Sequence, residues 1–307
     1  MAGESRMAVL AAIVGNLAIA AIKLVAAVLS GSASMLAEGI HSLVDTGNGT
    51  LMLHGMRSSR RPPDEAHPLG YGHELYFWTL IVGVLIFGLG GGMSMVTGVV
   101  HIVHGTPAED AWWSYAVLGV AAVFEGTSWY FGYRAFRTER RGRGVVATIR
   151  HTKNPTSFAV LLEDSAALLG LVFAFFGIFL SSRLGAPWID GAFSVLIGVL
   201  LCGIAIVMVY ESKGLLVGEG MDEDALAELR AIVDADPRVC RVERLLTMYL
   251  GPDEVLLAIA LRAAPDIRIA ELRRAIARIK REIRRRYPRI RRIYLDTASI
   301  HEPPPAA

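Results

Sequence analysis

Cysteine is scarce in this sequence. Only Cys202 and Cys240 occur among its 307 residues, the first in an apolar stretch and the second in the C-terminal third. Two separated thiols exclude a disulfide framework and a cysteine-rich metal cluster. The sequence also contains no HExxH motif, the signature in which two histidines bind zinc beside a glutamate base. A metallohydrolase is therefore a poor candidate.

Charged residues are also rare over the first two thirds of the chain. Hydrophobic residues make up 53% of the sequence, which is typical of a membrane protein and too apolar for an ordinary soluble enzyme. A run of about 20 apolar residues is long enough to cross a bilayer. We predict six spans, at residues 7–29, 32–54, 76–104, 112–134, 157–181 and 187–210. The first resembles a signal peptide, but its apolar run is longer than a signal core and no convincing cleavage site follows, so we expect a span.

Basic residues in the connections predict the orientation of the spans. They follow the second span and separate the fourth from the fifth (Arg57, Arg60, Arg61, Arg134, Arg137, Arg140, Arg141, Arg143, Arg150 and Lys153). The short connections GTPAED and SSRLGAPW contain one arginine between them. By the positive-inside rule, both chain ends face the cytoplasm. We expect a multi-pass protein of the cytoplasmic membrane, with lipid as its surroundings.

The pattern changes at residue 213 to that of a small soluble domain. Alternation in RVERLLTMYLG and DEVLLAIALRA around the turn GPDE predicts a hairpin. Helices are expected at residues 222–235 and around Leu272–Ile283, followed by a last strand in RIRRIYLDTAS. The sequence thus divides into a six-helix transmembrane domain, residues 1–212, and a cytosolic α-β-β-α-β domain of the α+β class, residues 213–307.

The basic run RRAIARIKREIRRRYPRIRR in this second domain has two interpretations. It suits nucleic acid or anionic lipid, but no aromatic or groove-reading motif accompanies it. We expect a solvated helix face near a negative leaflet and no nucleic-acid partner.

The stretch SMLAEGIHSLVDTGN carries ionisable side chains inside the second predicted span. His41 and Asp45 are four residues apart, so on a helix they project from one face. An ionisable group at membrane depth costs roughly 2.5 to 3.5 kcal/mol unless it meets a cavity, a partner or an ion. Two on one face favour a metal ion. The alternative is a helix–helix hydrogen bond or a hydrated helix end.

The fifth predicted span carries two adjacent acids, Glu163 and Asp164, in FAVLLEDSAALLGLVF. Adjacent residues on a helix are about 100° apart. At most one of the two therefore points squarely at His41 and Asp45. The other contacts a neighbouring span or subunit, or takes part in ion passage.

Several motifs together resemble the cation diffusion facilitator family of proton-coupled exporters of zinc and similar divalent cations. They are Asn16 and Lys23 in the first span, SGSASMLAEGIHSLVDTGN, DEAHPLGYGHE and the small domain after the last span. VLLEDSAALLG together with FEG is similar to the branch that contains the mitochondrial human zinc transporter. The resemblance implies zinc as transported substrate, no permanently bound cofactor, no enzymatic activity, and a homodimer formed through the metallochaperone-like, ferredoxin-like second domain.

The resemblance also implies a transport site of His41, Asp45 and Asp164. The family's fourth ligand lies four residues before Asp164, where this sequence has Val160. Water, Glu163, Glu38 or Glu125 remain as candidates for that position. For Glu125 the alternative is a buried partner of Lys23 or a hydrogen bond within the bundle. Manganese, iron, cobalt and cadmium stay open as substrates beside zinc.

The segment DEAHPLGYGHE between the second and third spans corresponds to a second metal site in some family members. Asp64 and His67 match that site, but Tyr71 stands at the next histidine position and His73 is displaced by two residues. We therefore expect a structured turn built by the segment's proline and glycines, in preference to a strong metal site.

Two functions are compatible with these features. In the first, metal export by alternating access is coupled to protons, and His41 is a candidate proton carrier because an imidazole titrates near neutral pH. In the second, Val160 marks a non-transporting membrane scaffold or metal sensor. The tail has few potential ligands, and regulatory metal binding there would depend on Cys240, His301 and scattered acids.

Overall fold

The structure is a computed structural model that describes residues 2–105, 111–139, 144, 155–264 and 267–296. His301 and several basic residues of the predicted connection between the fourth and fifth spans (Arg140, Arg141, Arg143, Arg150 and Lys153) lie outside the described residues. The chain folds into two compact units. We call residues 1–57 and 75–213 the membrane unit, and residues 58–74 and 214–307 the tail unit.

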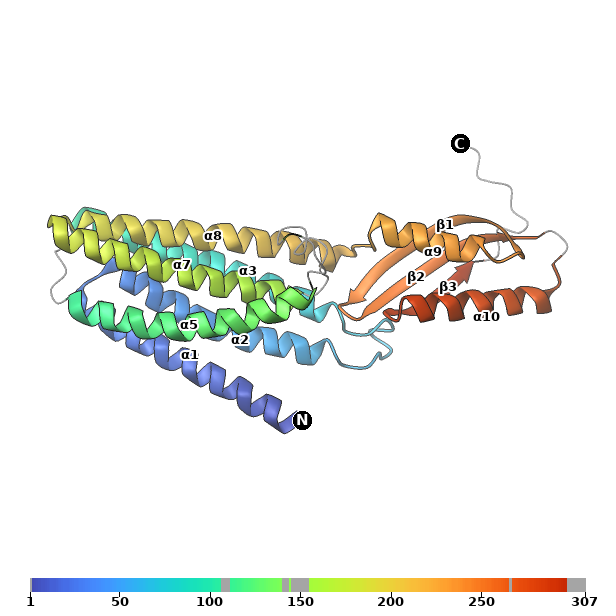
Figure 1. Cartoon of the computed structure of the whole chain (residues 1–307), viewed down its shortest axis with the longest axis horizontal. Helices are drawn as coiled ribbons and strands as arrows, with labels where there is room; N and C mark the ends of the chain where they lie inside the picture. Colours follow the sequence, from blue (N-terminus) through green and yellow to red (C-terminus); the bar gives the residue numbers. More distant parts are fainter. Residues whose placement is uncertain (1, 106–110, 140–143, 145–154, 265–266, 297–307) are drawn as a thin grey trace. The chain divides into compact units, whose positions relative to one another are not determined.

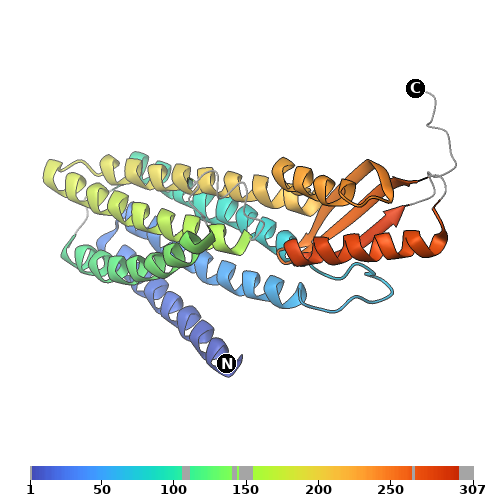
Figure 2. The ribbon, with the colours of Figure 1, turned by 45° about the vertical axis from the view of Figure 1, so that its right-hand side comes forward.

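The membrane unit consists of helices, most of which lie lengthwise beside one another in Figures 1 and 2, while the N-terminal end of α1 slants away from the rest. They are α1 (Ala2–Ser30), α2 (Ala33–Ser58), α3 (Glu74–Leu85), the π-helical segment η1 (Ile86–Gly92), α4 (Met93–His104), α5 (Ala111–Glu139), α7 (Pro155–Leu184) and α8 (Trp188–Val217). Helices α5 and α7 pack directly against each other, and α1 packs on α5.

In the part of the chain that the structure describes, three helical stretches are long and apolar enough to cross a membrane: Glu74–His104, Phe158–Leu184 and Trp188–Val217. Within the described residues, the apolar part of α1 is shorter, at Asn16–Ser30. Helices α2 and α5 are long, but polar and ionisable residues interrupt their apolar sequence. The count of six spans therefore stays a prediction.

Helices α3 and α4 form one continuous rod through η1, whose sequence IFGLGGG is rich in glycine. Glycine at Gly91 and Gly98 lets this rod approach α8 closely. A Cβ atom at Gly91 would collide with Cys202, and one at Gly98 would collide with the backbone of Gly191. Small residues at such contacts allow close packing of membrane helices without a solvent-driven hydrophobic effect.

The tail unit is a three-stranded sheet with two helices. Its elements are α9 (Glu223–Asp234), β1 (Val239–Gly251), β2 (Glu254–Ala263), α10 (Ile269–Arg286) and β3 (Ile290–Asp296). The strand order is β1-β2-β3, with β1 antiparallel and β3 parallel to the central β2. This is the α-β-β-α-β order expected from the sequence.

The alternation of β2 decides which face of the sheet is covered. Leu257, Ile259 and Leu261 are buried and belong to one core with Leu229 of α9 and Ile283 of α10. Because successive strand residues point to opposite faces, both helices cover the same side of the sheet.

Candidate metal centre

Helix α2 presents His41 and Asp45 on one face, as their spacing requires. His41 is 1% exposed, and its Nδ1 lies 3.3 Å from Asp45 Oδ1. The two atoms are not aligned as a hydrogen bond, so both ring nitrogens of His41 and Asp45 Oδ1 have no hydrogen-bond partner among the described residues. Buried polar atoms are nearly always paired. A nitrogen and an oxygen left facing each other are suited to a shared cation.

Helix α7 turns its two adjacent acids toward different helices. Glu163 Oε1 accepts a hydrogen bond of 3.0 Å from the Nδ2 amide of Asn48 on α2. Asp164 Oδ2 accepts one of 2.9 Å from the Ser128 hydroxyl on α5. Glu163 is thus the acid tied to the helix that carries His41, whereas the family resemblance assigns Asp164 to the site.

The Asp45 carboxylate is influenced both by the acids of neighbouring helices and by the buried Lys23. This carboxylate interacts electrostatically with Glu163 and Glu125, and also with Lys23. In the described part of the chain, however, no group of three or more His, Cys, Asp or Glu side chains is close enough to form a ready-made metal cage. Within the described residues, His41 and Asp45 are therefore a pair and not a complete ligand set.

Val160 lies one helical turn before Asp164 and shares its surroundings. A Cβ atom built on Gly132 of α5 would lie 3.6 Å from both Asp164 Oδ2 and Val160 Cγ1. This face of α7 is therefore turned toward α5. The family's fourth ligand position is occupied here by an apolar side chain next to a glycine.

Glu38 and Glu125, the other candidate ligands, are engaged with Lys23. The Lys23 Nζ atom lies 3.1 Å from Glu38 Oε2 and 3.5 Å from Glu125 Oε1. It also donates a hydrogen bond of 2.7 Å to the Ser42 hydroxyl. The lysine joins α1, α2 and α5, and it holds the two acids in an ion pair.

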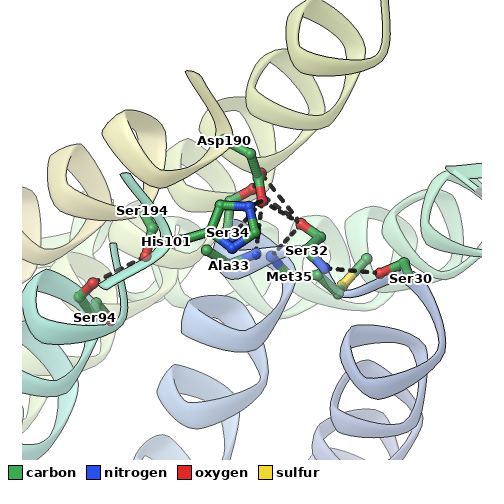
Figure 3. A network of polar contacts seen from close by, with 9 residues as sticks. All are labelled: Ser30, Ser32, Ala33, Ser34, Met35, Ser94, His101, Asp190 and Ser194. Atoms are coloured by element: carbon green, nitrogen blue, oxygen red, sulfur yellow. Dashed lines mark hydrogen bonds and ion pairs between the residues drawn. The ribbon is translucent and has the colours of Figure 1, made fainter. Parts of the chain in front are cut away.

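The N-terminus of α2 is anchored by Asp190 of α8, which sequence analysis did not single out. Figure 3 shows the Asp190 carboxylate facing the first residues of α2, with His101 of α4 beside it. Oδ2 accepts hydrogen bonds from the Ala33 amide (2.6 Å) and the Ser32 hydroxyl (3.0 Å), and Oδ1 accepts one from the Ser34 hydroxyl. The Ala33 amide is the first of the helix and has no hydrogen-bond partner within it. A buried acid from α8 therefore caps the helix that carries His41.

Asp64 and His67 lie together in the tail unit, while His73 points elsewhere. The Asp64 carboxylate accepts hydrogen bonds from the Tyr71 hydroxyl (2.6 Å) and the His67 amide (2.7 Å). These bonds, the one from Tyr71 first, lower the pKa of Asp64. The His73 Nε2 atom lies 2.9 Å from the carbonyl oxygen of Tyr249 in β1. Tyr71 stands at the position where family members with this metal site have a histidine, and its hydroxyl is bonded to the Asp64 carboxylate.

Residues 58–74 pack onto the tail sheet through their backbone. A Cβ atom at Gly72 would collide with the Leu250 carbonyl, and Arg292 of β3 donates a hydrogen bond of 3.0 Å to the Pro68 carbonyl. The turn expected from the glycines is therefore a docked part of the tail unit. The remaining tail candidate in the described residues, Cys240, is an exposed free thiol.

Comparison with known proteins adds to this geometry. Residues 9–217 match the cation efflux transmembrane domain. The chain belongs to the cation efflux family, the cation diffusion facilitators. This membership agrees with the resemblance seen in the sequence.

Three relatives illustrate the range of the similarity. The mitochondrial proton-coupled zinc antiporter SLC30A9 of Xenopus laevis is 34% identical over 235 residues, 76% of this chain and 42% of the relative. Metal tolerance protein C4 of Arabidopsis thaliana is 31% identical over 73% of this chain and 49% of its own length. Magnetosome protein MamB of Magnetospirillum gryphiswaldense is 23% identical over 91% of this chain and 87% of its own. The chain spans less than half the length of the first two relatives.

Sequence analysis missed four polar residues that contact the candidate ligands or cap the helix that carries them: Asn48, Ser42, Ser128 and Asp190. Asn48 had a local signal, because it lies three residues after Asp45 and so on the same helical face. The two serines and Asp190 had none, since their partners are on other helices. Sequence spacing does not report which helices become neighbours.

Proposed function

We propose that this chain transports a divalent cation, with zinc as the first candidate, across a membrane in exchange for protons. Family membership and the proton-coupled zinc antiporters among the relatives support this proposal. Manganese, iron, cobalt and cadmium are the alternative substrates, and zinc is preferred because a site that mixes imidazole and carboxylate suits it.

The observation that carries the proposal is the pair His41 and Asp45. Both ring nitrogens and the facing carboxylate oxygen are buried without a hydrogen bond within the described residues. A dication placed between them would replace an unsatisfied contact with two metal–ligand bonds. Protonation of the imidazole would in turn weaken metal binding. This gives the site a means of exchanging metal for protons.

A third ligand would come from α7. Asp164 is the family's choice, and Glu163 is the acid already bonded to Asn48 on α2. Each carboxylate has a second oxygen beyond the one that accepts the hydrogen bond. Either acid can therefore bind the cation while it keeps its bond to Asn48 or Ser128. Water completes the four positions that zinc prefers.

The proposal includes a topology of six spans in the cytoplasmic membrane with both chain ends in the cytoplasm. Basic residues after α2 support this orientation. It also includes a homodimer formed through the tail. The sheet face opposite α9 and α10 supports this, because Leu246 and Tyr294 on it are exposed and lie on either side of the partly buried Ala258 of β2.

The experiment is zinc uptake into proteoliposomes driven by a pH gradient. Wild-type protein is expected to accumulate zinc, whereas His41→Ala and Asp45→Asn should fall to the level of empty vesicles. His104→Ala is the matched control, because His104 is an exposed histidine at the end of α4 and should keep full uptake. Saturable zinc binding without uptake by the wild type would instead favour the scaffold or sensor.

A further inference from the structure

Lys23 is a charged side chain with no exposed surface in the membrane unit. It lies in α1 and is 0% exposed, as is its partner Glu38. A buried charge is tolerated only where opposite charges and hydrogen bonds surround it. The groups around its Nζ atom therefore form a site that stabilises a positive charge.

Three oxygen atoms from two helices converge on that position. Ser42 Oγ is 2.7 Å, Glu38 Oε2 is 3.1 Å and Glu125 Oε1 is 3.5 Å from Nζ. Ser42 follows His41 directly, and Glu38 precedes it by one turn of α2. The position is thus beside the proposed transport site, and the contacts that the described residues make with Nζ are all through oxygen atoms.

Glu38 provides a second and independent observation, which concerns its other carboxylate oxygen. Its Oε1 atom is buried and has no hydrogen-bond partner among the described residues. It lies against Gly170 of α7, where a Cβ atom would collide with it. A buried carboxylate oxygen without a donor costs free energy, and it offers an additional ligand to any ion that replaces the ammonium group.

We propose that Lys23 fills a second cation position formed by Glu38, Ser42 and Glu125, and that it thereby keeps hard divalent cations out of the transport unit. An all-oxygen set of two carboxylates and a hydroxyl suits manganese, magnesium or calcium more than zinc. Lys23 is in this sense a specificity-determining residue. The inference deepens the proposed function, since it concerns which metals occupy the same unit, but its test does not depend on transport.

The test counts manganese bound to full-length protein in detergent, in the presence of saturating zinc. Wild type is expected to bind no manganese beyond the background. Lys23→Met removes the ammonium group and should bind one additional manganese ion per protomer, visible as loss of the free-manganese spectrum in electron paramagnetic resonance. Lys23→Arg, which keeps the charge, should behave as the wild type.

Two further variants make the outcome specific. Lys23→Met combined with Glu38→Gln should lose at least tenfold in manganese affinity relative to Lys23→Met alone. Lys23→Met combined with Glu243→Gln, a tail-unit acid paired with Arg262, is the matched control and should keep the additional ion. If Lys23→Met bound no more manganese than the wild type, the inference would be wrong.

Stability supplies the second measurement, because two buried acids without a counter-ion destabilise the fold. The melting temperature of Lys23→Met should fall in metal-free buffer and recover when manganese is added. A variant that manganese does not restore would also overturn the inference. Failure of the wild type to bind zinc at His41 would instead contradict the proposed function, and the manganese count would still be measurable.

Discussion

Replacing Asp190 with alanine is expected to destabilise the membrane unit substantially. Asp190 accepts hydrogen bonds from the Ala33 amide and from the hydroxyls of Ser32 and Ser34, all at the start of α2. Alanine removes every acceptor at once. The donors lie in buried residues, since Ala33, Ser32 and Ser34 are at most 3% exposed.

The size of the effect follows from these three donors. Loss of the helix cap on the Ala33 amide costs about 1 kcal/mol. Each buried hydroxyl left without an acceptor costs at least about 1 kcal/mol. We use this lower bound for each hydroxyl, because the Ser32 and Ser34 oxygens are 3.4 Å apart and can bond to each other. The total is roughly 3 kcal/mol, which corresponds to a fall in melting temperature of about 6–12 °C for a unit of this size.

The assay is thermal unfolding of the full chain in detergent, followed by intrinsic fluorescence. Asp190→Asn, which keeps one acceptor oxygen, should lose about half as much stability. Ser194→Ala is the control on the same helix, because that hydroxyl donates a single hydrogen bond to the Ser94 carbonyl. A melting temperature for Asp190→Ala within 1 °C of the wild type would refute the assigned role of Asp190 as the cap of α2.

Three further predictions concern other parts of the chain. Gly170→Ala should lower the free energy of unfolding by about 1–3 kcal/mol, because the added Cβ atom collides with Glu38. Gly119→Ala is the control, because its Cβ atom meets no neighbouring atom. Equal melting temperatures of the two variants would count against the close contact at Gly170. Tyr71→Phe should raise the lowered pKa of Asp64 toward its ordinary value, measured by carbon-13 NMR of labelled aspartate. In the wild type, the bond from Tyr71 stabilises the loop fully above the ordinary carboxyl pKa, and this stabilisation is lost as the pH falls through the lowered pKa of Asp64. An unchanged titration of Asp64 in Tyr71→Phe would contradict this. The isolated tail, residues 213–307, should fold without metal, because in the residues the structure describes its core is apolar and no group of metal-binding side chains is present; a chelator that removed its circular dichroism signal would overturn this.

Local patterns predicted the parts of the molecule that depend on neighbours along the chain. The alternation of apolar residues in β1 and β2 led to the three-stranded tail, and the four-residue spacing placed His41 above Asp45 on one face of α2. The divergence of Glu163 from Asp164 follows in the same way from the 100° between adjacent helical residues. These relations are set by helix and strand geometry alone.

Contacts between helices could not be predicted in this way. Asp190 lies far along the chain from Ser32, and nothing in either segment indicates that they meet. The partners of Lys23 come from α2 and α5, and only the possibility of a pair with Glu125 was foreseen. The π-helical segment η1 was also missed, because its glycines indicate close packing without indicating the helix type.

The outcome for residues 58–74 shows a further limit of sequence patterns. Glycine and proline in DEAHPLGYGHE indicate a turn, and a turn is what the structure contains. That the turn packs on the tail sheet depends on Gly72 meeting the Leu250 carbonyl and on Arg292 meeting the Pro68 carbonyl. Such contacts depend on the surface shape of a separate part of the chain.

The most direct test of the account is an anomalous-scattering map of crystals of the full chain soaked in zinc. The account predicts a zinc peak within bonding distance, about 2.0–2.2 Å, of a His41 ring nitrogen and an Asp45 carboxylate oxygen. An acid of α7 or a water molecule should complete the ligand set. Zinc bound only at Asp64 and His67, with no peak beside His41, would contradict it.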